Sequence, residues 1–261
     1  MTGDIQDVLS GVALFVALVA ALESGYRLGQ RAADEGDTRG AGQVGAIQGA
    51  MLGLLGLLLG FSFAAAGARF LERQDLIVSE ANAIGTAYYR AELLDDPHRS
   101  DLRRALAEYT RDRLNIASRI RDGLSDADHA RVGAYHAHMW NAARAGVELK
   151  PAFALAVLDP VNSVIDLHTT RLAASNKHVP GPVIWLLVAC SMLSVGVIGY
   201  GCGTSRRRRA PLSLSLAALI SCALWLTIDL DHPRAGLLQL SDAPLEALRL
   251  HVEATPPAMG G

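Results

Sequence analysis

The sequence predicts an all-α membrane protein, with four transmembrane helices and a helical extramembrane bundle inserted between spans two and three. Three observations lead to this fold class. Hydrophobic residues make up 51% of the 261 residues and charged residues 19%, and dense charged blocks alternate with long uncharged runs. The longest runs supply the roughly 20 apolar residues that cross a bilayer core. The polar block between them has helical apolar spacing and no long alternation with a period of two.

The same composition excludes several classes of protein. A formal net charge of −2 does not fit a strongly basic nucleic-acid binder. The three cysteines, Cys190, Cys202 and Cys222, lie in or beside apolar runs and form neither a disulfide framework nor a zinc-ligand pattern. We expect them to be small apolar packing residues. A disordered chain and a conventional soluble enzyme are not expected, and no cofactor is implied.

The first span is the weakest of the four. It follows an acidic segment with Asp4 and Asp7 but no basic residue, so we expect a retained helix and not a cleaved signal peptide. Because its strictly apolar part is short, three spans remain an alternative. The four apolar or uncharged runs cover residues 8–22, 40–68, 179–205 and 210–228. This divides the chain into residues 1–68, an insert at 69–178, a second span pair at 179–230 and a tail at 231–261.

The insert is polar but locally neutral, with 15 basic and 15 acidic side chains. Its punctuation predicts about four helices, and the first continues the second span because nothing between Gly67 and Leu94 breaks it. Ser125 with Asp128 resembles a capping box. The other expected helix starts are Asp96-Pro97 and Asp159-Pro160, and the expected stops are Gly123 and Pro151.

Four consecutive arginines at 206–209 set the predicted orientation. By the positive-inside rule, the loop between the last two spans is cytoplasmic, which places both termini and the insert on the other side. Basic residues also flank the membrane on the insert side, and long domains follow this rule poorly. The side on which the insert lies therefore remains open.

Glycines dominate one side of the second span. Gly45, Gly49, Gly53, Gly56 and Gly60 fall within an arc of about 80°. Gly67 and Phe63 share this stripe, while Ile47, Met51, Leu54, Leu58 and Phe61 lie opposite. The stripe is typical of close helix packing. It also fits a helix repeated around an axis, with one face lining a pore that has a hydrophobic constriction. The two interpretations are compatible.

A charged cluster follows this span on the same predicted helix. It is either a solvated helix face or a vestibule that concentrates ions at a pore mouth. Glu72 could pair with Arg69, and Glu80 with Arg73. Within the span, Gln48 fits an interhelical hydrogen bond better than a selectivity element. The cluster consists of Arg69, Glu72, Arg73, Asp75, Glu80, Asn82 and Arg90.

The segment GAMLGLLGLLLGFSFAAAGARFLER at 49–73, followed by VSEANAIGTAYYRAELL at 78–94, resembles the bestrophin-like domain family. That family is distantly similar to bestrophin anion channels, in which the second transmembrane helix of each of five subunits lines the pore. The resemblance implies a homo-oligomeric, anion-conducting channel with span two at the axis. Two departures are the arginine loop, which opposes a cytoplasmic insert, and the lack of an acidic run like a calcium clasp.

The faces of the second span and the charged cluster after it supply two sets of candidate residues. The pore-lining candidates are Gly49, Gly53, Leu54, Gly56, Leu58, Gly60, Phe61 and Phe63. The vestibule or selectivity candidates are Gln48, Arg69, Glu72, Arg73, Glu80, Asn82 and Arg90. The expected partners are the lipid bilayer, further copies of the chain and inorganic ions, and not nucleic acid. The expected location is the inner membrane of a bacterium.

Other motifs carry less weight. His129, His136 and His138 lie near one another but lack a well-spaced carboxylate or cysteine, so no metal site is expected. Asp229 and Asp231 are predicted to cap the end of the last span. No nucleophile, paired acid or metal set indicates an enzyme. The alternative to a channel is a non-transporting scaffold or sensor whose insert binds a partner or ligand.

Overall fold

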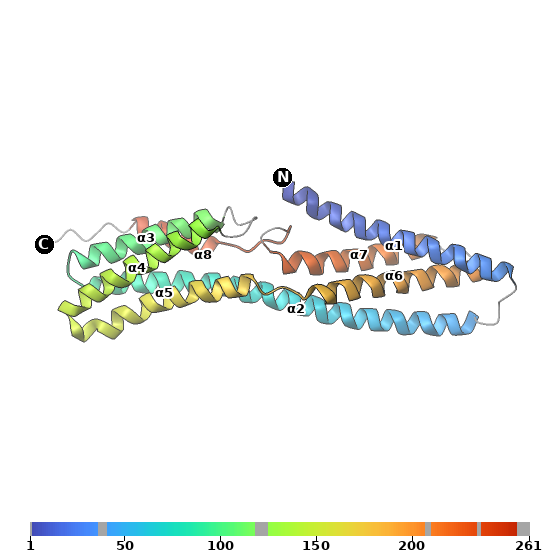
Figure 1. The fold of residues 1–261 in the computed structure, drawn as a ribbon, viewed down its shortest axis with the longest axis horizontal. Helices are drawn as coiled ribbons and strands as arrows, with labels where there is room; N and C mark the ends of the chain where they lie inside the picture. The colour runs from blue at the N-terminus through green and yellow to red at the C-terminus, as the bar shows by residue number, and fades with distance from the viewer. Residues whose placement is uncertain (1, 36–40, 118–124, 207–209, 234–235, 255–261) are drawn as a thin grey trace. The chain divides into compact units, whose positions relative to one another are not determined.

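The computed structural model describes residues 2–35, 41–117, 125–206, 210–233 and 236–254, and its regular structure there is entirely helical (Figure 1). The chain divides into two compact units. We call residues 1–70 and 178–239 the membrane unit, and residues 71–177 and 240–261 the extramembrane unit. The α-helices are α1 (Thr2–Asp34), α2 (Ala41–Arg90), α3 (His98–Ala117), α4 (Asp126–Leu149), α5 (Ala154–Ser175), α6 (Gly181–Thr204), α7 (Ala210–Asp231) and α8 (Ala243–Ala254).

Within the described residues, four helices are long and apolar enough to span a bilayer, as the sequence predicted: α1, α2, α6 and α7. In the membrane unit, α1 and α6 pack with their backbones in close contact. A Cβ at Gly25 or Gly29 on α1, or at Gly199 or Gly203 on α6, would collide with the backbone of the other helix. Small residues of this kind allow close packing between transmembrane helices. The sequence pattern predicts glycine-mediated packing on α2, and not between α1 and α6.

The extramembrane unit contains the end of α2 together with α3, α4, α5 and α8. Its core includes Ile84, Tyr109, Met139 and Val161, all buried. The predicted continuation of the second span is confirmed, because α2 runs unbroken to Arg90. Sequence analysis did not anticipate α8, which lay in the predicted tail and contributes buried Leu245 and Val252 to this core. Leu245, Leu248 and Val252 have the helical spacing that could have revealed it.

Helix boundaries test the predicted caps. The capping box of Ser125 and Asp128 is confirmed at the start of α4, and α4 ends just before Pro151. The predicted start at Asp159-Pro160 is wrong, because α5 begins at Ala154 and Pro160 lies inside it. Gly123 and the arginines at 207–209 lie outside the described residues.

A single hydrogen bond explains how α5 accommodates this proline. Proline has no N–H to donate to the carbonyl four residues earlier, which is that of Ala156. The Nη1 atom of Arg90 donates to this carbonyl at 3.1 Å. A side chain from α2 thereby replaces the missing backbone donor, and α5 continues past the proline.

Candidate functional site

Helix α2 presents one covered face within the membrane unit. Leu55 is buried in the apolar cluster of this unit, and Leu52 and Leu59 pack against it. On the same side, Nε2 of Gln48 donates to the carbonyl of Val197 on α6 at 2.9 Å. Gln48 therefore forms an interhelical hydrogen bond, the role that its sequence position favoured.

The glycine face of α2 is uncovered. We define it as Gly45, Gly49, Gly53, Gly56, Gly60 and Gly67; a Cβ built at any of these positions meets nothing within 4 Å in the described chain. This is the opposite of the situation at Gly199, where α1 leaves no room for a Cβ. Among the described residues, the repeated glycines of α2 therefore contact no other helix. A surface this flat suits close approach by another helix.

Opposite the glycine stripe lies a second uncovered surface, which we call the bulky face and define as Ile47, Leu54 and Phe61. Leu54 is 53% exposed and Phe61 67% exposed. Phe63, on the glycine side, is also exposed. Leu58 differs from the other pore-lining candidates, because it is half-buried and packs against the apolar cluster of the membrane unit. Two of the three faces of α2 are thus uncovered by the described part of the chain.

The charged residues that follow the span separate into different environments. Nε of Arg69 lies 3.3 Å from Oδ1 of Asp231 at the end of α7. Glu72 is exposed, with its Oε1 3.6 Å from Nζ of Lys177. Arg73 is buried and donates to the carbonyls of Ala174 and Lys177. The pairing expected between Arg69 and Glu72 is therefore wrong, because each has a partner from a distant part of the sequence.

Glu80 occupies the centre of a buried polar network in the extramembrane unit. Its side chain is 0% exposed and accepts hydrogen bonds from Tyr109 at 2.6 Å, from Nε of Arg113 at 3.1 Å and from Arg171. Burial raises the pKa of Tyr109 to about 12, so its hydroxyl stays protonated and donates to the carboxylate. A fully buried Glu80 cannot line a vestibule wall. Among the remaining vestibule candidates, Asn82 is exposed, and Arg90 donates a hydrogen bond to the backbone of α5.

Two histidines adjoin this network. The rings of His136 on α4 and His168 on α5 lie 5.1 Å apart in an edge-to-face arrangement, and His136 also contacts Tyr109. Burial, together with the nearby Arg113 guanidinium, lowers the pKa of both imidazoles, that of His168 to about 4. Both rings are therefore neutral at pH 7. Sequence analysis grouped His136 with His129 and His138, but the structure pairs it with a residue 32 positions later.

The acidic pair at the end of α7 acts as predicted. The carboxylate of Asp229 accepts from the backbone N–H groups of Leu237 and Leu238 at 2.8 and 2.9 Å. The carboxylate of Asp231 accepts from the N–H of Val179 at 2.9 Å. Both side chains thus satisfy backbone donors beside a membrane span, where unsatisfied donors are costly.

Fold and composition together define an all-α integral membrane protein with four spanning helices and a helical extramembrane unit. The Bestrophin-like domain profile matches residues 10–245, and the chain belongs to this family. No curated protein matches the sequence.

Solved structures with low sequence identity share the fold. A bacterial bestrophin homologue from Klebsiella pneumoniae that carries a single substitution superposes with a TM-score of 0.65 at 14% identity, over 90% of this chain and 97% of that chain. A crystal structure of a bestrophin homologue from the same organism, solved by zinc anomalous phasing, gives 0.62 at 15% identity, over 94% and 95%. The crystal structure of a membrane protein with a single substitution gives a TM-score of 0.64 at 14% identity, over 97% of this chain and 99% of that chain.

Proposed function

We propose that the protein is a homo-oligomeric ion channel of a bacterial inner membrane, with α2 of each subunit at the central axis. The observation that carries this proposal is the uncovered surface of α2. Its glycine face and its bulky face have no cover from the other residues that the structure describes, although the third face packs tightly. An axis surrounded by copies of α2 uses both surfaces, because one face contacts the neighbouring subunit while the other lines the pore.

The proposed preference for anions rests on family membership and on the similarity to bestrophin homologues. The arginines that follow the span support the anion preference less than their positions in the sequence suggest. Arg69 is ion-paired with Asp231, and Arg73 is buried against backbone carbonyls. We therefore assign the constriction, and not a ring of these arginines, to the α2 span. Leu54 and Phe61 are the side chains that we place there.

Ion flux from liposomes tests the proposal. Protein reconstituted with internal chloride should release it faster than empty liposomes, and potassium and proton gradients should dissipate more slowly. Leu54→Ala and Phe61→Ala should each raise the chloride rate several-fold, because a smaller apolar side chain widens a constriction that excludes water. Leu193→Ala on α6 is the matched control, since Leu193 is 61% exposed but lies on another span.

Two outcomes would contradict the proposal at different points. Unchanged rates in both α2 variants of an active protein would remove these residues from the pore. The absence of flux under every gradient, from protein shown to be folded and oligomeric, would favour the scaffold or sensor and direct attention to the extramembrane unit.

A further inference from the structure

We infer that Asp75 on α2 sets the balance between anions and cations in the proposed channel, as a ring of carboxylates at the extramembrane mouth of the pore. The inference rests on the proposed function, which places α2 of each subunit at the axis. Asp75 belongs to the charged cluster that follows the second span, but it is not among the vestibule candidates. A ring of aspartates at a pore mouth attracts cations and repels anions. Asp75 therefore works against the anion preference.

Asp75 lies on the uncovered side of α2 in the extramembrane unit. Its side chain is exposed, and Leu71 and Val78 on the same face are 62% and 39% exposed. Ile84, nine residues after Asp75, is fully buried in the core of this unit. Nine residues correspond to a net rotation of about 180° around a helix. Asp75 is therefore on the side of α2 directly away from the core, where no described residue covers it.

Helix geometry relates Asp75 to the residues that we place at the constriction. The helix α2 is continuous from Ala41 to Arg90. Phe61 and Leu54 precede Asp75 by 14 and 21 residues, which puts them about 40° and 60° from it around the helix. At 1.5 Å per residue, Asp75 lies about 21 Å beyond Phe61 along the helix. An axis that faces Leu54 and Phe61 therefore also faces Asp75, just beyond the end of the span.

The carboxylate of Asp75 has no partner among the residues that the structure describes. It forms neither a hydrogen bond nor an ion pair there, and only the backbone carbonyl of Asp75 is engaged, by the hydroxyl of Ser79 at 2.9 Å. This distinguishes Asp75 from the other acidic residues of the cluster. Glu72 lies 3.6 Å from Lys177, and Glu80 is buried between two arginines.

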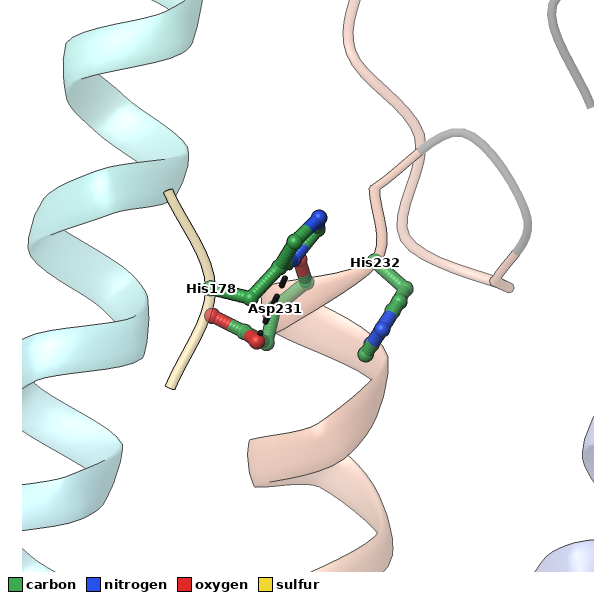
Figure 2. A group of neighbouring side chains, drawn as sticks. All are labelled: His178, Asp231 and His232. Carbon is green, nitrogen blue, oxygen red and sulfur yellow. Dashed lines mark hydrogen bonds and ion pairs between the residues drawn. The ribbon is translucent and has the colours of Figure 1, made fainter. Parts of the chain in front are cut away.

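The arginines that precede Asp75 on α2 are occupied elsewhere. Nε of Arg69 lies 3.3 Å from Oδ1 of Asp231, whose carboxylate also lies beside the ring of His178 (Figure 2). Arg73 is buried and donates to backbone carbonyls at the end of α5. Neither guanidinium forms an ion pair with Asp75. Because every subunit contributes one such carboxylate, the uncompensated charges add around the axis and act on ions that enter the mouth.

Reversal potentials across planar bilayers that contain the full-length protein test the inference. A gradient of KCl gives the permeability ratio of chloride to potassium. Asp75→Asn should raise this ratio by about threefold or more, and Asp75→Lys should raise it further, because the charge at the mouth is first removed and then reversed. Asp75→Glu keeps the charge and should match the wild type. Because the Debye length falls from about 30 Å at 0.01 M to about 3 Å at 1 M salt, the effect of Asp75→Asn should be large in dilute KCl and small near 1 M.

Asp159→Asn is the matched control. Asp159 is exposed and lies on α5, so its replacement removes the same charge from the chain at a position away from α2. The permeability ratio of this variant should equal that of the wild type. Circular dichroism should show the same melting temperature for both Asn variants, since neither aspartate is buried.

The possible outcomes separate this inference from the proposed function. A conducting wild type whose permeability ratio is unchanged in Asp75→Asn and Asp75→Lys would overturn the inference and leave the channel in place. An equal change in Asp159→Asn would also overturn it, because the position of the charge would then not matter. The absence of current from folded, oligomeric wild-type protein would contradict the proposed function, and the inference would fail with it.

Discussion

Glu80→Gln should destabilise the extramembrane unit strongly, although it only replaces one carboxylate oxygen by an NH₂ group. Glu80 is fully buried and is the shared partner of Arg113 and Arg171, both largely buried. Neutralising it leaves two guanidinium groups without their counterion and directs an amide N–H₂ toward them. Breaking a buried ion pair by removing one partner typically costs about 3–5 kcal/mol. A loss of this size lowers the melting temperature of a domain by about 10 °C or more.

Thermal unfolding of purified protein in detergent, followed by circular dichroism, measures this effect. Glu72→Gln provides a matched control on the same helix. Glu72 is exposed and lies 3.6 Å from Lys177, so its loss should cost no more than about 0.5 kcal/mol. Arg113→Met should cost less than Glu80→Gln, because Arg171 still pairs with the carboxylate. A melting temperature for Glu80→Gln within 2 °C of that of the Glu72 variant would refute the reasoning.

Three further predictions address other contacts. Gly199→Ala should lower the melting temperature, since its Cβ collides with the α1 backbone, whereas Gly53→Ala should not lower it but should reduce the oligomeric fraction in light scattering. Because the folded pKa of His168 lies below its ordinary value, stability should be full above pH 7. It should then fall by up to about 1.4 kcal/mol per unit between pH 6.5 and 4, and His168→Gln should flatten this profile. Arg90→Met should cost about 1 kcal/mol in unfolding titrations, but almost nothing alongside Pro160→Ala, which restores the backbone donor.

Local signals in the sequence predicted much of the fold. The four spans follow from the length of the apolar runs, and the start of α4 follows from two residues three positions apart. Pro160 predicts the wrong helix start because the helix passes through it with the help of Arg90, which bonds the carbonyl of Ala156 from 66 residues earlier. No local pattern contains that information. A proline near an aspartate looks the same whether or not a distant donor replaces its N–H.

The candidate site was less predictable for the same reason. Glu72 and Glu80 lie two turns apart and look alike in sequence, yet one is exposed and the other is fully buried. What distinguishes them is the position of Arg113 and Arg171, 33 and 91 residues after Glu80. The group of His178 with Asp231 likewise joins residues 53 positions apart. Such polar clusters depend on tertiary packing, which spacing along one helix cannot reveal.

Glycines with the same spacing in sequence have different surroundings in the structure. Those on α1, α6 and α2 have similar spacing, but only the α1 and α6 sets touch another backbone. A glycine inside a helix costs about 0.8–1.0 kcal/mol relative to alanine, so six on one face of α2 weaken it by about 5–6 kcal/mol. No contact within the described residues offsets this cost. We therefore expect the compensation to come from contacts between subunits, and this expectation connects the open glycine face to the proposed oligomer.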